Sequence, residues 1–76
     1  MPHIVVKLYK GRSEAQKQKI AAEITRAIIR SADCSEESVS VSIEDVLPAD
    51  WDREVFEPEI AGRTGTLYKK PGYREV

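Results

Sequence analysis

The chain has 76 residues, and a chain near this length buries only about 60% of the surface that its unfolded form exposes. We therefore expect a small core that subunits share in a homo-oligomer. Twelve Lys and Arg residues against 13 Asp and Glu residues give a net charge of −1, so the chain lacks the basic field that binds nucleic acid.

The single cysteine, Cys34, excludes an internal disulfide, and no Cys and His cluster has the spacing of metal ligands. The sequence lacks the pattern of a secretory signal, and no apolar run is long enough to cross a bilayer. These features predict a cytoplasmic protein with no metal and no membrane partner.

Residues 4–9, with the sequence IVVKLY, alternate between two faces, which predicts a half-buried strand. Ser13 followed by Gln16 has the pattern of a capping box and predicts the start of a helix that continues to about Ser31. Lys17 and other charged residues of this helix are expected in water. Its apolar face is expected to comprise Ile20, Ile24, Ala27, Ile28 and Ser31.

Residues 38–46, with the sequence SVSVSIEDV, alternate again and predict a second strand. The order strand, helix, strand predicts a crossover between two parallel strands, in an α+β fold. Two strands and one helix leave sheet edges uncovered, which predicts that the sheet continues into another subunit. Residues 1–76 are expected to form a single domain.

The sequence after Pro48, which ends the second strand, has no regular alternation. Pro58 suits the first turn of a short helix, which Gly62 and Gly65 would weaken. The turn sequence KKPGY at residues 69–73 precedes a terminus that is expected either to fray or to lie across a neighbouring subunit.

Pro2 is the first residue that could carry chemistry. As an internal residue it has an amide nitrogen without a basic lone pair, but removal of Met1 would make it a secondary amine on a rigid ring. A free α-amino group titrates near pH ~8, and burial of its charged form lowers its pKa toward values that suit a general base. The alternative is chance, since proline makes up about 5% of average sequence.

Three further residues are candidates for binding or structural roles. Arg12 follows the first strand and could hold a carboxylate through two hydrogen bonds, or lie solvated in its loop. Trp51, the single tryptophan, could line an apolar pocket or pack in a core or a subunit interface. His3, the single histidine, is interpreted as structural rather than catalytic.

Several segments together resemble the 4-oxalocrotonate tautomerase family: Pro2 at the start of a strand, GRS at residues 11–13, IIRS at residues 28–31 and the serine-rich second strand. The tail is similar to a longer branch of that family, through Trp51, PEIA at residues 58–61 and KKPGY. The resemblance covers essentially the whole chain. It implies a β-α-β protomer and an enzyme without a cofactor that moves a proton between carbon atoms, or from oxygen to carbon, of a 2-oxo acid and its enol.

The resemblance also assigns a role to each candidate residue. Pro2 matches the catalytic base, Arg12 the arginine that binds the substrate carboxylate, and Trp51 the aromatic residue that lines the pocket. Ser40 stands where the founding enzymes carry a second active-site arginine. This departure implies a phenylpyruvate-like monocarboxylate as substrate, with Arg53 or a group from a partner chain as the candidate substitute for that arginine.

The extended tail implies a homodimer rather than a hexamer, with a four-stranded sheet and pockets lined by both chains. Two other functions stay open at this point. The first is a hydratase or decarboxylase of the same superfamily, in which Pro2 stays protonated. The second is a non-catalytic binding or scaffold subunit, since a fold does not guarantee a function. Retention of Met1 would favour the second, because Pro2 would then be an amide, but a small second residue normally permits removal of the methionine.

Overall fold

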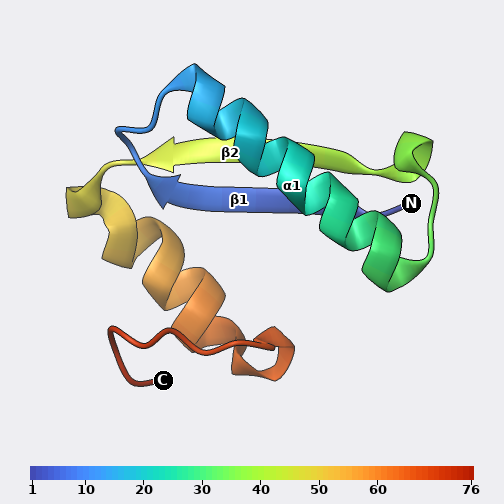
Figure 1. Cartoon of the computed structure of the whole chain (residues 1–76). Helices are drawn as coiled ribbons and strands as arrows, with labels where there is room; N and C mark the ends of the chain where they lie inside the picture. The colour runs from blue at the N-terminus through green and yellow to red at the C-terminus, as the bar shows by residue number, and fades with distance from the viewer. The chain divides into compact units, whose positions relative to one another are not determined.

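The computed structural model describes residues 1–76 and divides them into two compact units, residues 1–46 and 47–76. The first unit contains β1 (His3–Tyr9), α1 (Glu14–Ala32) and β2 (Ser40–Val46). Figure 1 shows α1 lying across the sheet that the two strands form. The predicted β-α-β arrangement is confirmed.

The two strands pair in parallel, with His3 opposite Ser40 and Tyr9 opposite Val46. Val41 and Ile43 of β2 line one groove with Ala21 of α1, so the sheet face that carries these two residues is the one that α1 covers. β2 begins two residues later than the expected position 38, because residues 36–38 form a 3₁₀ turn, η1 (Glu36–Ser38).

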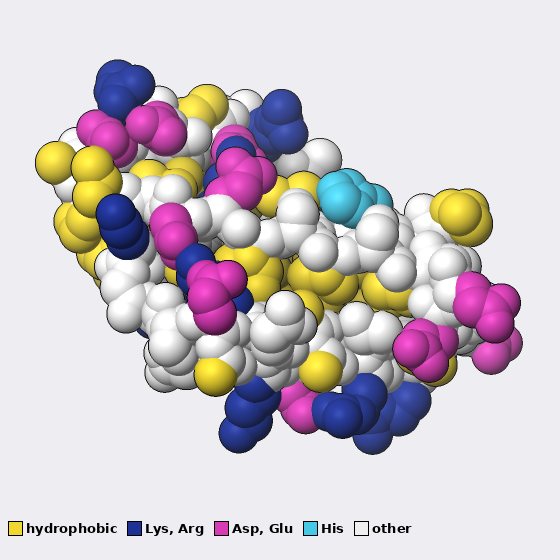
Figure 2. All heavy atoms as spheres, turned by 90° about the horizontal axis from the view of Figure 1, so that it is seen from above, with side chains coloured by type: hydrophobic (Ala, Val, Ile, Leu, Met, Phe, Trp, Pro, Cys, Tyr) yellow, Lys and Arg dark blue, Asp and Glu magenta, His cyan; other side chains and the backbone are white.

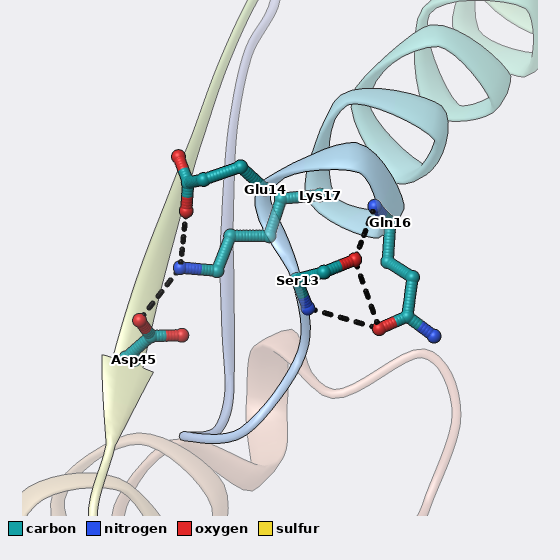
Figure 3. A network of polar contacts seen from close by, with 5 residues as sticks. All are labelled: Ser13, Glu14, Gln16, Lys17 and Asp45. Atoms are coloured by element: carbon teal, nitrogen blue, oxygen red, sulfur yellow. Dashed lines mark hydrogen bonds and ion pairs between the residues drawn. The ribbon is translucent and has the colours of Figure 1, made fainter.

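The capping box at the start of α1 is present. The backbone N–H of Gln16 donates to Ser13 Oγ at 3.1 Å, and the backbone N–H of Ser13 donates to Gln16 Oε1 at 2.9 Å (Figure 3). The covered face of the helix differs in part from the expected one. Ile20, Ile24 and Ile28 are half-buried as expected, but Ala27 and Ser31 are exposed, and the face includes instead Ala21, Thr25 and Ile29.

Lys17 lies at the contact between helix and sheet, so the expectation that it is in water is wrong. Its Nζ donates to Asp45 Oδ2 of β2 at 2.6 Å and to Glu14 Oε2 at 3.1 Å, and its side chain is only 18% exposed (Figure 3). The hydrogen bond to Asp45, followed by the one to Glu14, raises the pKa of Lys17. This ion pair ties the first turn of α1 to the end of β2.

The second unit contains the 3₁₀ helices η2 (Pro48–Asp50) and η4 (Ala61–Thr66) on either side of the π-helix η3 (Asp52–Ile60). Pro58 lies inside η3, so the prediction that it opens a short helix is wrong. Proline has no N–H to donate and crowds the carbonyl of the preceding turn, and the wider turn of a π-helix relieves that crowding.

Few side chains are buried in the single chain. Val46, Val55 and Phe56 are buried, none of them completely, and no residue of α1 is among them. Acidic and basic side chains are interspersed on the face that Figure 2 shows, as the near-zero net charge leads one to expect. The helices are all too short or too polar to span a lipid bilayer.

Candidate active site

Pro2 and Ser40 lie side by side at the amino-terminal ends of β1 and β2. The backbone N–H of Ser40 donates to the carbonyl oxygen of Pro2 at 3.1 Å. Pro2 is half-buried, whereas Met1 is fully exposed, so removal of Met1 would cost no packing. Because the chain continues from Pro2 directly into β1, the proline ring is held at a fixed end of the sheet.

Ser40 makes a second contact at this end of the sheet, through its side chain. Its Oγ and the Nδ1 of His3 are 2.7 Å apart, within hydrogen-bond distance. The strand register pairs His3 with Ser40, and the alternation of side chains turns both away from the face covered by α1. A neutral hydroxyl and an imidazole therefore lie next to Pro2, and the sequence did not indicate this pair because the two residues are far apart in the chain.

Arg12 lies beyond the opposite end of β1. It follows the turn at Gly11, whose φ of 137° suits glycine, and its Nη1 donates to the carbonyl oxygen of Tyr9 at 3.2 Å. A guanidinium has five N–H donors, so this bond leaves others for a carboxylate. The seven residues of β1 span about 20 Å, and Pro2 and Arg12 of one chain therefore do not converge.

An apolar groove of about 390 Å³ runs along α1 from Arg12. Ile20 and Ile24 contribute to its lining, together with Gln16 and two charged side chains of opposite sign, those of Lys19 and Glu23. A cation at the border of an apolar groove is a suitable surface for a small molecule that has a carboxylate at one end and an apolar group at the other.

Trp51 and Arg53 belong to the second unit. The indole Nε1 of Trp51 donates to the hydroxyl of Tyr73 at 3.0 Å, and Trp51 is half-buried. Arg53 Nη2 donates to Asp50 Oδ1 at 3.0 Å and to Glu54 Oε2 at 3.1 Å. These contacts, the hydrogen bond to Asp50 first, raise the pKa of Arg53, so a substrate carboxylate would have to compete with two carboxylates of the protein.

Pro2, once Met1 is removed, and Arg12 have the chemistry for two distinct functions. A secondary amine at Pro2 would serve as a general base, and the guanidinium of Arg12 would anchor a carboxylate. A base of this kind could move a proton between the enol and keto forms of a 2-oxo acid, and an anchor of this kind could orient the acid. The hydroxyl of Ser40 beside Pro2 adds a neutral polar contact and no charge.

Comparison with known proteins identifies the family. The model of the family described as "Tautomerase enzyme" matches residues 2–57. The chain is 45% identical over 74 residues to "Tautomerase PptA" of Cronobacter sakazakii (strain ATCC BAA-894), which covers 96% of this chain and 97% of that protein. It is 37% identical over 76 residues to a "Probable tautomerase" of Xylella fastidiosa (strain 9a5c), over 100% of this chain and 93% of that protein.

A solved structure from a study of the 4-oxalocrotonate tautomerase isozymes of Methylibium petroleiphilum is similar to this chain, with a TM-score of 0.64 and 32% sequence identity. The similarity covers 66% of this chain and 81% of that chain. The match to the PptA protein extends over nearly the whole length of both proteins. The chain belongs to the tautomerase family, whose activity is that of an isomerase.

Proposed function

We propose that the chain is a cofactor-independent tautomerase that interconverts the keto and enol forms of a phenylpyruvate-like 2-oxo monocarboxylate. The position of Pro2 carries the proposal. The family match begins at this residue, and the hydrogen bond from Ser40 holds its carbonyl at the start of β1. The working form begins at Pro2, after Met1 has been removed.

In the direction from enol to ketone, the nitrogen of Pro2 takes the proton of the enol hydroxyl. The electron pair of the broken O–H bond forms the new C=O bond, and the electron pair of the C=C bond takes a proton at the adjacent carbon. Protonated Pro2 supplies that proton and returns to the neutral amine. The reaction is an isomerisation, so it needs no oxidant, reductant or co-reactant.

Arg12 anchors the substrate carboxylate through paired hydrogen bonds. Because Pro2 and Arg12 lie at opposite ends of β1, we assign the two groups of one active site to different chains: Arg12 of one subunit serves Pro2 of another. A homodimer in which the sheets of two protomers join would provide two such sites. Such an assembly would also cover surface that the small core leaves exposed.

The surroundings of Pro2 favour one carboxylate rather than two. Ser40 offers a neutral hydroxyl that already pairs with His3, where the founding enzymes have an arginine. Arg53, the other candidate, is engaged with Asp50 and Glu54. Trp51 contributes the aromatic wall against which an apolar substrate side chain packs.

Ketonisation of phenylenolpyruvate tests the proposal. The wild-type protein, whose intact mass should show the loss of one methionine residue, is compared with Pro2→Ala. We expect kcat/KM of the variant to fall by about 100-fold, because the primary amine that then begins the chain lacks the rigid ring that fixes the Pro2 nitrogen, and a misplacement of about 1 Å can cost that much. Far-UV circular dichroism and the oligomer mass show that the variant is folded.

Equal activity of wild type and Pro2→Ala, or full activity of protein that retains Met1, would contradict the proposal. The pH dependence of kcat/KM distinguishes the proposed tautomerase from a hydratase or decarboxylase. If Pro2 is a base, kcat/KM falls as the pH drops through the pKa of the amine, whereas a reaction that needs protonated Pro2 slows as the pH rises.

A further inference from the structure

The tail of the second unit folds back onto η3 of its own chain instead of fraying. The hydroxyl of Tyr73 accepts the hydrogen bond from Trp51 Nε1 at 3.0 Å. The Tyr73 ring also packs against Phe56, with the ring centres 6.2 Å apart and the planes inclined at 56°. Phe56 is only 2% exposed, so this contact connects the tail to the core of the unit.

Arg74, the next residue, holds the tail in place. Its guanidinium lies over the Phe56 ring, 3.9 Å from the ring centre, in the geometry of a cation–π contact. It also pairs with Asp52 at 3.2 Å and with Glu57 at 3.6 Å, both on η3. A single exposed ion pair contributes little, but a planar guanidinium that stacks on a buried ring and pairs on two sides has a defined position.

We propose that Tyr73 and Arg74 are positioning residues for Trp51. The indole has one N–H donor, and the bond to Tyr73 fixes the rotation of the ring. Arg74 fixes Tyr73 in turn, through the shared contact with Phe56. The inference rests on the proposed function, in which Trp51 forms the aromatic wall of the pocket. The tail then controls selectivity for the substrate side chain and leaves the proton transfer at Pro2 unchanged.

Fluorescence tests the positioning without reference to activity, because Trp51 is the single tryptophan of the chain. Tyr73→Phe removes one hydroxyl and keeps the ring. We expect acrylamide quenching of the Trp51 emission to rise by about twofold, since an indole released from its partner samples more orientations. Arg74→Gln should act in the same direction. Tyr68→Phe is the matched control, because Tyr68 is 99% exposed. In this variant the quenching of Trp51 emission should equal that of wild type.

Steady-state kinetics test the consequence for the substrate. For Tyr73→Phe and Arg74→Gln we expect the KM for phenylenolpyruvate to rise about three- to tenfold at nearly unchanged kcat. The KM for enolpyruvate, which has no aromatic ring, should change much less. Tyr68→Phe should leave both constants as in wild type.

Quenching and KM values that match those of Tyr68→Phe in both tail variants would overturn the inference. So would a loss of kcat equal for both substrates, which would indicate a general structural role of the tail. Increased quenching without a change in KM would also overturn the inference. In that case the KM of Trp51→Leu shows which assumption is wrong. If Trp51→Leu also leaves KM unchanged, the assignment of Trp51 in the proposed function is wrong rather than its contact with the tail.

Discussion

At the residue scale, the proposed mechanism depends on the covalent state of Pro2. The same nitrogen is an amide while Met1 is attached and a base once Met1 is removed. The sequence alone indicated Pro2 and Arg12 as candidate site residues, because residue type and position along the chain are enough to suggest a terminal amine and a guanidinium after a strand. It did not indicate the contact between His3 and Ser40, which are 37 residues apart and meet only through the register of the parallel strands.

Ser40→Arg is predicted to shift the substrate preference toward dicarboxylate enols. The change replaces a hydroxyl beside Pro2 with a guanidinium, and a hydrogen bond to a charged group is worth about 1.5–3 kcal/mol. We expect kcat/KM for 2-hydroxymuconate relative to phenylenolpyruvate to rise by about tenfold or more. Ser42→Arg is the control, since Ser42 lies on the same face two residues farther along β2. Equal shifts in both variants would mean that net charge, and not position, determines the preference.

At the scale of elements, the ion pair of Lys17 ties α1 to β2, and its effect on stability should depend on pH. The folded state raises the pKa of Lys17 above its ordinary value of 10.5, chiefly through the hydrogen bond to Asp45. The folded state thus binds this proton more tightly than the unfolded chain does. The resulting stabilisation is complete below the unfolded pKa and is lost as the pH rises through the folded pKa.

We therefore expect Lys17→Met to lower the free energy of unfolding at neutral pH, and the difference from wild type to shrink as the pH rises above the ordinary lysine pKa of 10.5. Denaturant titrations at fixed protein concentration provide the measurement. Lys19→Met is the control, because Lys19 is exposed on the same helix, and it should show the smaller difference at neutral pH. A difference for Lys17→Met that grows with rising pH would contradict the raised pKa of Lys17 in the folded state.

Substitution by alanine is predicted to change the stability of the protein differently at Gly62 and at Gly65, both in η4. A Cβ atom at Gly62 would lie 2.7 Å from the carbonyl oxygen of Glu57, whereas one at Gly65 would meet nothing within 4 Å. We expect Gly62→Ala to destabilise by about 1–3 kcal/mol, the usual cost of overpacking. Gly65→Ala should be neutral or stabilise by up to about 1 kcal/mol. Thermal unfolding of both variants provides the comparison, and a stabilised Gly62→Ala would show that the contact relaxes freely.

The elements that the sequence predicted well are those with a regular period. Alternation found both strands, and the capping box at Ser13 located the start of α1, because these patterns report local geometry. The second unit was predicted poorly. Pro58 normally marks the start of a helix, and the rule failed because η3 adopts the wider π-helical turn, which a rule based on ordinary helices does not include.

At the scale of the whole molecule, the prediction that the active unit contains more than one chain rests on the small core and on the proposal that Pro2 and Arg12, which lie far apart in one chain, serve the same site. Few side chains are buried in the single protomer, as its length leads one to expect. The family match at residues 2–57 extends over parts of both compact units. A single domain over residues 1–76 and a homodimer both stay predictions.

Mixing two inactive variants tests the shared site. If Arg12 of one chain serves Pro2 of its partner, a heterodimer of Pro2→Ala and Arg12→Ala contains one intact site. Co-refolding equal amounts makes half of the dimers mixed, so we expect about a quarter of wild-type activity to return. Mixing Pro2→Ala with the double variant should restore none. The absence of recovery from proven heterodimers would place both groups of the site in one chain.

The sharpest test of Pro2 as the catalytic base changes no side chain. Protein that retains Met1, prepared with methionine aminopeptidase inhibited, is assayed with phenylenolpyruvate before and after treatment with that enzyme, and intact mass follows the removal of Met1. We predict that activity is nearly absent while Pro2 is an amide and rises in proportion to the fraction of chains that begin at Pro2. Equal activity before and after removal would contradict the proposed mechanism, because a nitrogen without a basic lone pair would then be carrying out the same chemistry as an amine.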